Sequence, residues 1–382
     1  MKIAMFTDSY KPQVNGVVTS IEMAKKSLEK KGHDVMVFAP SVPKYTDTEG
    51  GIHRFKSVSF MAHKEYRISA PVDFLAENRG FEFDVIHVHT PFSIGALALG
   101  LTRKYYVPCV GTFHTLFSEY IHYFIRPQFI GEIKEVKMLF DKFSWRYLPW
   151  FYNQMDSIIS PSESIKNLLE KKGIRKKISV VPTGIKDSMI SRKTKKDCRK
   201  KFNFGSGKIV LHVGRISKEK NLAFLITSLK DILLKSDSRL VITSEGPEKP
   251  SLERLVRNLG IEKSVVFAGY MAESDIADMY RAADIFVMAS KSETQGVVLL
   301  EAAANGLPCV VLDAPVTSDF VRKNRIGIVS KEDEFAAGVE KMLNEGGAYA
   351  KNAAAHGRRY APDKFANSLL RIYKQTKKHQ ES

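Results

Sequence analysis

The stretch from residue 284 to residue 305 constrains the fold of this chain more than any other. Residues 284–289 are mostly apolar or β-branched, which is typical of a buried strand. Polar residues follow, and Gly296 then precedes Val297–Ala304, an Ala- and Leu-rich run that predicts a helix. Parallel sheets are built from strand, loop and helix in this order, and they bind ligands at the carboxyl ends of their strands. The sequence therefore predicts an α/β fold with a ligand site in this loop.

Two carboxylates flank the predicted start of this helix, with Glu293 in the loop and Glu301 on the helix. The backbone N–H groups of Gly296 and Val297 fall at the helix N-terminus, where unpaired donors and the dipole favour a phosphate. Glu301 would then accept hydrogen bonds from a ribose diol, and Glu293 from a second sugar. The pattern favours a nucleotide sugar. A structural alternative stays open, in which Glu293 complements the helix dipole and Glu301 lies on a solvated face.

The string around these two glutamates resembles the E-x7-E motif of the retaining family 4 glycosyltransferases. Glu293 and Glu301 have the spacing of that motif, and Gln295 and Gly296 lie between them. Members of this family have the GT-B fold, in which two Rossmann-like parallel-sheet domains face a cleft. The resemblance implies that a nucleotide-sugar donor, with UDP-hexose expected, is held by residues Thr294, Gln295, Gly296, Val297 and Glu301.

The length and cysteine content fit this interpretation. A chain of 382 residues is long enough for two domains. Residues 2–6 are too short for the apolar core of a signal peptide, and no apolar run approaches the roughly 20 residues of a membrane span. Cys109, Cys198 and Cys309 lie far apart without metal-ligand spacing, which predicts reduced thiols and no metal site. We expect a cytoplasmic protein, peripheral on the inner face of the membrane.

The net charge of +17 indicates attraction to a polyanion. Residues 166–201 contain 14 Lys or Arg residues against three acidic ones. An anionic membrane surface or nucleic acid would suit such a patch, although a solubilising surface is an alternative. No helix-turn-helix, zinc finger or RNP-like string accompanies the charge, so no nucleic acid is expected as a partner.

The first half of the chain begins with a predicted βαβ unit, consisting of a strand at 2–9, a helix to about residue 31 and a strand at 34–39. It lacks G-x-G-x-x-G, which argues against a dinucleotide. Gly16 has no Cβ, so the loop at Asn15 and Gly16 could approach a phosphate, or it could be an ordinary turn. Members of the family place such a glycine over the donor pyrophosphate, and here Asn15 replaces one of their two glycines.

Three histidines fall near predicted parallel strands. His87 and His89 alternate within the strand at 84–89, so at least one should be a packed core histidine. His114 follows the strand at 108–112, where parallel strands deliver functional side chains, although a lone histidine is often structural. By resemblance to the histidine loop of the family, His114 would contact the transferred sugar.

The sequence that follows His114 resembles the branch of the family that glucosylates diacylglycerol. Residues 114–123 fit its H-T-x-x-x-x-Y-x-H-Y string, which implies that Tyr120 and His122 serve a lipid acceptor. Apolar residues between 133 and 147 recur at helical spacing, with Lys134 and Lys137 beside them and Trp145 near the end. A basic amphipathic helix with aromatic residues is typical of an interfacial membrane anchor. A helix that faces the protein core is the alternative.

The second half has its own motifs. Gly214-Arg215 and Lys220 follow a predicted strand, so both cations can reach one anion and stabilise a departing diphosphate without a metal. They could also be ordinary surface basics, but G-R-x4-K-N is the second hallmark of the family. Two further loops, by resemblance, approach the donor through Gly246, Tyr270 and Met271. Ser244 departs from the G-x-G-P of the family.

These features predict three segments. Residues 1–182 would form the acceptor-binding domain, residues 183–360 the nucleotide-sugar-binding domain, and residues 361–382 a helix that crosses back to the first. The implied reaction is retaining transfer of a hexose, with glucose expected, from a nucleoside diphosphate to a lipid hydroxyl such as that of diacylglycerol. His114, Arg215, Lys220 and Glu293 would be catalytic, and no essential cofactor or metal is expected.

Other functions stay open. A transferase could act on a soluble sugar or on a phosphoinositol acceptor. A glycoside hydrolase would also use two carboxylates, but it would need no basic pair. A basic membrane or nucleic-acid binding protein without activity would explain the charge but not the ordered motifs.

Overall fold

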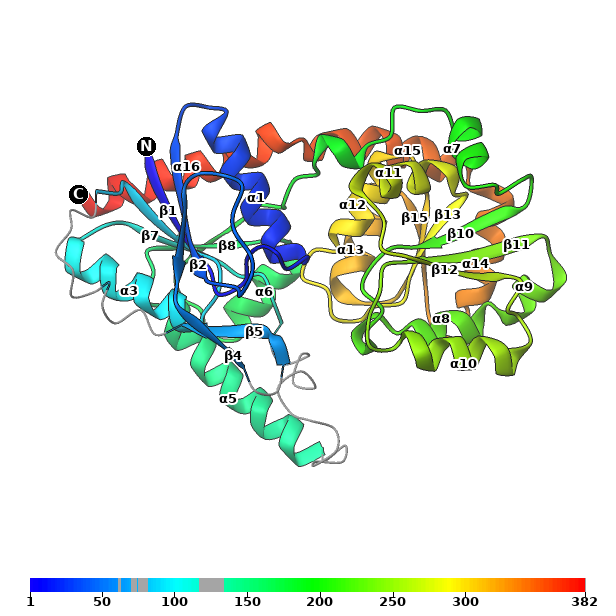
Figure 1. Cartoon of the computed structure of the whole chain (residues 1–382), viewed down its shortest axis with the longest axis horizontal. Coiled ribbons are helices and arrows are strands. Elements are labelled where there is room, and N and C mark those ends of the chain that lie inside the picture. The colour runs from blue at the N-terminus through cyan, green and yellow to red at the C-terminus, as the bar shows by residue number, and fades with distance from the viewer. Residues whose placement is uncertain (61–62, 70–73, 75–81, 117–133, 382) are drawn as a thin grey trace. The chain divides into compact units, whose positions relative to one another are not determined.

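A computed structural model describes residues 1–60, 63–69, 74, 82–116 and 134–381. The chain divides into two compact units, which we call unit 1 (Met1–Gly184 with Pro362–Ser382) and unit 2 (Ile185–Ala361) (Figure 1). Each unit is built on a parallel sheet with helices on both faces, which confirms the predicted α/β class. Among the described helices, none combines the length and the apolar character that a membrane span requires.

The sheet of unit 1 has seven parallel strands in the order β3-β2-β1-β6-β7-β8-β9. Its strands are β1 (Lys2–Phe6), β2 (Asp34–Pro40), β3 (Ile52–Phe55), β6 (Val85–Val88), β7 (Cys109–Thr112), β8 (Ser157–Ser160) and β9 (Lys177–Val180). An antiparallel pair, β4 (Ser57–Phe60) with β5 (His63–Ser69), is separate from this sheet. Strands β2 and β3 are added on one side of β1, and β6 and the later strands on its other side. Ligand-binding loops are expected at this point of reversal, between β1 and β6.

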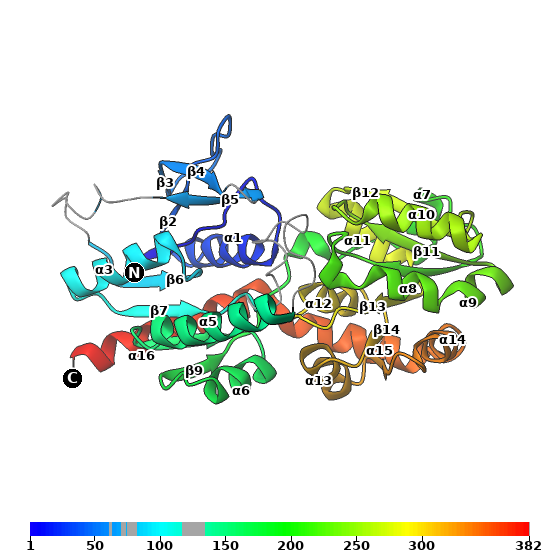
Figure 2. The ribbon, with the colours of Figure 1, turned by 90° about the horizontal axis from the view of Figure 1, so that it is seen from below.

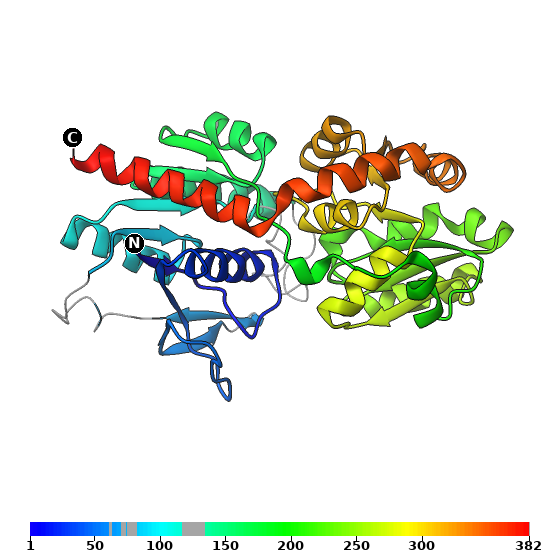
Figure 3. The ribbon, with the colours of Figure 1, turned by 90° about the horizontal axis from the view of Figure 1, so that it is seen from above.

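The helices of unit 1 are α1 (Gly16–Glu29), α3 (Ser93–Tyr105), α5 (Lys134–Tyr152), α6 (Glu163–Lys171) and α16 (Pro362–Glu381). Helices α1 and α16 lie side by side on one face of the sheet (Figure 3), and α3 and α5 lie on the other (Figure 2). The last helix is integral to this unit, because Leu369 and Tyr373 are buried in the same core as Ile21 of α1. Thr376 adds a 2.8 Å hydrogen bond between its hydroxyl and that of Ser157.

The sheet of unit 2 has six parallel strands in the order β12-β11-β10-β13-β14-β15. They are β10 (Lys208–His212), β11 (Ser238–Thr243), β12 (Val265–Gly269), β13 (Ile285–Met288), β14 (Cys309–Leu312) and β15 (Gly327–Ser330). After β12 the chain returns to the other side of β10, so the point of reversal lies between β10 and β13.

Helices cover both faces of the sheet of unit 2 (Figure 1). One face packs against α8 (Leu222–Ser228), α9 (Lys230–Lys235), α10 (Lys249–Leu259) and α14 (Phe335–Glu345). The other packs against α7 (Lys195–Lys201), α11 (Glu273–Ala282), α12 (Val297–Ala304), α13 (Pro315–Asn324) and α15 (Gly347–Gly357). Short 3-10 turns are η2 (Asp187–Met189), η3 (Lys218–Lys220) and η4 (Arg358–Tyr360).

The apolar residues between 222 and 234 predict a single helix, and this prediction is wrong in its extent. The apolar run from residue 222 to residue 234 forms two helices, α8 and α9, with Leu229 between them. The hydroxyl of Ser228 donates to the carbonyl of Leu225 at 3.1 Å and competes with the backbone for that acceptor. Leu229 N also donates to this carbonyl, at 3.2 Å, so two donors share one acceptor where α8 ends.

The basic stretch at 166–201 is divided between the two units, and its part in unit 2 is largely paired. Lys193 contacts Asp278 at 2.6 Å, and Lys201 contacts both Asp275 at 2.5 Å and Asp278 at 2.7 Å. Lys195 and Arg199 pair with Asp284 in the same way, at 2.7 and 3.1 Å. These cations hold α7 to the rest of unit 2, so their clustering in the sequence overstates the free positive charge.

Candidate functional site

The point of strand reversal in unit 2 brings together two loops that carry predicted site residues. One loop follows β10 and ends in η3 with Lys220, and the other follows β13 and contains Glu293. Two hydrogen bonds join the loops: the Asn221 amide donates to the carbonyl of Ala289 at 3.4 Å, and the Ser290 hydroxyl donates to the carbonyl of Glu219 at 3.1 Å. The loops therefore lie where open α/β sheets bind ligands.

The two loops meet in an ion pair that is largely buried. Lys220 Nζ lies 2.6 Å from Glu293 Oε1, and the two side chains are only 18% and 15% exposed. Burial by itself would lower the pKa of Lys220, but the Glu293 carboxylate outweighs it and leaves that pKa raised. Burial would likewise raise the pKa of Glu293, and the Lys220 ammonium leaves it lowered. Both groups are therefore charged near neutral pH.

The loop after β10 is also locked to the loop after β11. Ile216 N donates to the carbonyl of Glu245 at 3.0 Å, and Glu248 N donates to the carbonyl of Ile216 at 3.1 Å. A Cβ on Gly246 would lie 2.1 Å from the Ile216 oxygen, so only glycine permits this approach. These contacts fix the backbone at Arg215. The preceding residue, Gly214, has a φ of 148°, which also favours glycine.

Glu301 lies in a different environment. It is on α12, is only 9% exposed, and its Oε2 accepts a 2.9 Å hydrogen bond from the hydroxyl of Tyr280. Burial raises its pKa to about 7. The alternative that this glutamate lies on a solvated helix face is therefore wrong.

The other residues predicted to bind the donor lie in loops that follow strands of the unit 2 sheet. Gly296 is the residue before α12 and has a left-handed φ of 71°, so Val297 is the first helical residue. Thr294 and Gln295 precede it in the loop, and Gln295 is buried. After β12, Tyr270 is 72% exposed, whereas Met271 packs against the core to which α11 and α12 contribute.

In unit 1, the predicted Asn15-Gly16 loop caps α1. Asn15 Oδ1 accepts a 3.0 Å hydrogen bond from Val18 N, and Gly16 is the exposed first residue of the helix. The loop is anchored by Arg54, which donates to the carbonyl of Lys11 at 2.9 Å and lies 5.3 Å from the ring of Tyr10. This arginine was not predictable from the sequence, because nothing local connects β3 with the loop.

His114 is paired with His89. The distance from His89 Nδ1 to His114 Nε2 is 3.0 Å, while His89 Nε2 is buried without a partner among the described residues. A buried N–H without an acceptor is costly, so the tautomer with its proton on Nδ1 is favoured, and in that tautomer His89 donates to His114. Burial lowers the pKa of His114 to about 4, and it is therefore neutral at pH 7.

His87 is a core histidine, as predicted for at least one of the two in its strand. Its two ring nitrogens lie 2.7 Å from the hydroxyls of Tyr373 and Thr112. A buried carboxylate that the sequence analysis missed, Asp8, accepts from the hydroxyls of Thr90 and Ser93, each at 2.7 Å. Asp8 therefore ties the loop after β1 to the loop after β6.

The predicted acceptor residues are only partly described. Tyr120 and His122 lie outside the described residues, and Lys134 and Lys137 lie on the first turn of α5. Trp145, also on α5, stacks on Phe113 with ring centroids 6.5 Å apart and lies 5.0 Å from Lys172 Nζ. Its neighbours along α5 are more open to solvent: Met138, Leu139, Phe143 and Trp150 are 67%, 69%, 67% and 60% exposed.

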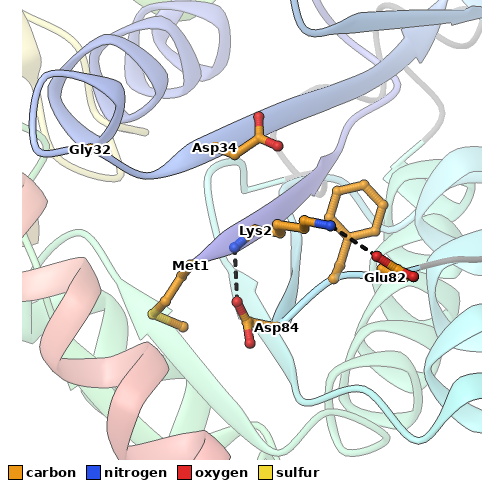
Figure 4. Close-up of a pocket in the computed structure, with 7 residues that line it drawn as sticks. Met1, Lys2, Gly32, Asp34, Glu82 and Asp84 are labelled. Atoms are coloured by element: carbon orange, nitrogen blue, oxygen red, sulfur yellow. Dashed lines mark hydrogen bonds and ion pairs between the residues drawn. The ribbon is translucent and has the colours of Figure 1, made fainter.

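A surface hollow of about 510 Å³ lies at the amino ends of β1 and β2 (Figure 4). It is therefore at the end of the unit 1 sheet opposite to the carboxyl ends of the strands. Lys2 Nζ donates to Glu82 at 2.9 Å, and Lys2 N donates to Asp84 at 2.8 Å. Its charged groups bind one another, so we assign it no function. In the described part of the chain, no three His, Cys, Asp or Glu side chains gather as metal ligands would.

Comparison with known proteins identifies the family. The profile described as Glycosyltransferase Family 4 matches residues 14–188, and the one described as Glycosyl transferases group 1 matches residues 194–360. An alpha-monoglucosyldiacylglycerol synthase of Streptococcus pneumoniae is 34% identical over 350 residues, which are 88% of this chain and 77% of that protein. The chain belongs to glycosyltransferase family 4.

Two further relatives extend the match to nearly the whole chain. An alpha-monoglucosyldiacylglycerol synthase of Acholeplasma laidlawii is 27% identical over 98% of this chain and 96% of that protein. The crystal structure of Anabaena Alr3699/HepE in complex with UDP-glucose superposes with a TM-score of 0.76 at 16% identity, covering 98% of this chain and all of that one. The GT-B fold with its two Rossmann-like domains is thus confirmed, and the chain is a glycosyltransferase.

The departure from the family motif at Ser244 has a backbone consequence in this glycosyltransferase. Ser244 has a φ of 79°, in the left-handed region that favours glycine, and its N–H donates to the carbonyl of Gly269 at 2.6 Å. The turn therefore keeps the conformation that suits a glycine and carries a serine side chain in addition.

The burial of the Lys220–Glu293 pair gives a stability prediction. In Lys220→Met the carboxylate of Glu293 is left buried without its cation, so we expect the free energy of unfolding of unit 2 to fall by about 3–5 kcal/mol. The variant Lys220→Met with Glu293→Gln should regain most of it. Urea unfolding followed by circular dichroism measures the change, with the fluorescence of Trp145 and Trp150, both in unit 1, as the internal reference.

The matched control is Lys291→Met. Lys291 and Glu332 are also 2.6 Å apart, but their side chains are 58% and 57% exposed, so at most about 1 kcal/mol should be lost. Because the folded pKa of Glu293 is below 4.5, the contribution of its pair is complete above that pH and is lost as the pH falls. Equal losses at the two sites would show that burial does not matter here.

Proposed function

We propose that this glycosyltransferase moves a hexose, glucose, from UDP-glucose to a hydroxyl of a lipid such as diacylglycerol, with retention of the anomeric configuration. The observation that carries the proposal is the buried Lys220–Glu293 pair, 2.6 Å apart at the point of strand reversal in unit 2. A preformed cation and carboxylate at this edge suit a ligand that has a diphosphate next to a sugar. The crystal structure of Alr3699/HepE with UDP-glucose, a protein of the same fold, supports this donor.

In the proposed reaction the bond between the hexose C1 and the diphosphate oxygen breaks, and a bond from C1 to the acceptor oxygen forms on the same face. The leaving diphosphate takes the proton of the acceptor hydroxyl. Lys220 and Arg215 stabilise the negative charge that develops on that diphosphate, a role that needs no metal. Glu293 accepts from a hydroxyl of the hexose, and Glu301 accepts from the ribose diol.

Unit 1 supplies two further groups in this proposal. His114 contacts the transferred hexose as a neutral ring whose tautomer is set by His89, because its Nε2 accepts from His89 Nδ1. The backbone at Asn15 and Gly16, at the start of α1, contacts the diphosphate. The exposed position of Gly16 without a Cβ is compatible with a close approach to an anion.

The lipid acceptor is supported by the names of the two curated relatives, both alpha-monoglucosyldiacylglycerol synthases. It is also supported by the exposed apolar side chains of α5. Leu139, Phe143 and Trp150 are spaced so that they share one side of the helix, with exposed basic residues Lys142 and Arg146 beside them. Such a helix can bury apolar side chains at the headgroup boundary while its cations meet anionic lipids.

Peripheral binding to the cytoplasmic face of a membrane is therefore part of the proposal. The three cysteines are all free and buried, which is compatible with a reducing compartment. A transferase with a soluble sugar or a phosphoinositol acceptor is the other outcome that the experiment below distinguishes.

The activity test uses liposomes that contain diacylglycerol with UDP- or GDP-sugars, and mass spectrometry to detect the product. We expect a glycosylated diacylglycerol from UDP-glucose. Lys220→Met and Glu293→Gln should each lower kcat by about 10²-fold or more, since each removes a group placed at the developing charge or the sugar. Lys291→Met, at the exposed pair, should leave the rate unchanged. Glycosylation of soluble acceptors alone would overturn the lipid assignment and leave the donor site intact.

Membrane docking through α5 has a separate test. Changing Leu139 and Phe143 together to Ser should weaken partition onto vesicles of phosphatidylglycerol and phosphatidylcholine by about tenfold or more, because less apolar surface is buried. Sedimentation with the vesicles measures it. Leu234→Ser, which alters a side chain 53% exposed in unit 2, is the control and should bind as the unmodified protein does. If both variants bind equally, α5 is not the docking surface.

A further inference from the structure

Glu301 is held by a tyrosine from another helix. Tyr280, on α11, is fully buried in the core of unit 2, with its ring 6.0 Å from that of Phe286. Its hydroxyl lies 2.9 Å from Glu301 Oε2, and no described residue donates to Oε1 of the same carboxylate. The contact joins α11 to α12 at a residue that the proposed function places at the ribose.

The direction of this hydrogen bond is fixed when Glu301 is ionised, since only the phenol then carries a proton. Burial raises the pKa of Tyr280 well above its usual range, and the nearby Glu301 carboxylate raises it further. The phenol is therefore protonated near neutral pH, and it is the donor whenever Glu301 is ionised. Because its ring is packed in the core, the hydroxyl has one position, and it determines where Oε2 of Glu301 lies.

We propose that Tyr280 is a positioning residue for the ribose of the nucleotide-sugar donor, because its hydroxyl holds Glu301 Oε2 and leaves Oε1 to accept from the ribose diol. This inference rests on the proposed function, in which Glu301 binds the ribose. It adds that the tyrosine makes the carboxylate available as an anion, and so couples donor binding to pH.

The coupling follows from the environment of Glu301. Burial raises the pKa of Glu301 to about 7, and the Tyr280 hydroxyl opposes that rise. Two charged groups act on it more weakly: Glu273 raises the pKa and Lys186 lowers it. These two form a 2.5 Å ion pair with each other, so their effects largely offset. From α15, which packs along α12, His356 has a lowered pKa and is uncharged near neutral pH.

The affinity for the donor should fall as the pH is lowered. A protonated Glu301 has fewer acceptor sites for the diol, so the donor must displace the proton when it binds. Affinity should be constant above the folded pKa of Glu301 and should fall about tenfold for each pH unit below it. UDP-glucose is a suitable probe because its diphosphate diester has no group that titrates near pH 7.

The test is the dissociation constant of UDP-glucose between pH 5.5 and 8.5, measured by calorimetry on the full chain and on Tyr280→Phe. Without the phenol hydroxyl the anion of Glu301 loses a donor, so the bend in the profile should move up by about one pH unit. Affinity should then drop about fivefold at pH 7 and stay within about twofold at pH 8.5. With saturating donor, kcat should stay within about twofold, because the ribose is remote from the reacting carbon.

Calorimetry in two buffers of different ionisation enthalpy supplies an independent readout. Binding at pH 7 should release part of a proton in the wild-type protein, more in Tyr280→Phe, and none in Glu301→Gln. Tyr360→Phe is the matched control, since it removes a phenol hydroxyl from unit 2 at a residue whose ring packs against Phe320, and it should leave the profile unchanged.

The outcomes separate the two levels of the proposal. A bend that stays in place in Tyr280→Phe, or an equal loss of affinity at every pH, would overturn the role of Tyr280. Equal affinity for UDP-glucose and its 2′-deoxyribose analogue, with no proton release, would overturn the ribose site at Glu301 while the donor assignment stands. No binding of UDP- or GDP-sugars at any pH would overturn the proposed function itself.

Discussion

The largely buried ion pair of Lys220 and Glu293 is the contact on which the candidate site of unit 2 depends. Two charges that are less than one-fifth exposed must neutralise each other, because an unpaired buried charge is far more costly than the pair. The pair can form only because β10 and β13 are adjacent parallel strands whose following loops leave the same edge of the sheet. Sheet topology thus places a cation and an anion together at a position suited to a ligand.

The surrounding contacts hold these loops in place. Asn221 and Ser290 tie the two loops to each other, and the close approach of Gly246 to Ile216 fixes a third. A buried ion pair contributes little net stability compared with well-packed apolar residues. Its burial on loops fixed in this way is therefore compatible with the donor-binding role proposed for it.

The two glutamates of the motif differ in chemistry because their surroundings differ. The Lys220 ammonium lowers the pKa of Glu293, whereas burial beside the neutral phenol of Tyr280 raises that of Glu301 to about 7. One carboxylate is thus permanently charged near neutral pH, and the other is poised to gain or lose a proton. Two residues of the same type, Glu293 and Glu301, can therefore serve two subsites with different pH dependence.

The sequence predicted those elements whose determinants are local. The helix Val297–Ala304 has its predicted bounds, because Gly296 and the run of Ala and Leu specify it. The partners of site residues were not predictable: Tyr280 and His89 reach Glu301 and His114 only through the packing of separate elements. The basic composition around α7 was misleading, since the aspartates that neutralise it come from α11 and from the residue before β13, far along the chain.

The most direct measurement is a crystal structure with a non-transferable analogue of UDP-glucose bound. We expect Lys220 Nζ at hydrogen-bonding distance from a diphosphate oxygen and Glu293 at that distance from a hexose hydroxyl, so that the 2.6 Å contact between them is shared with or replaced by the ligand. A donor bound elsewhere, with the Lys220–Glu293 pair unchanged and without contact to the ligand, would contradict the assignment of this pair to the donor site.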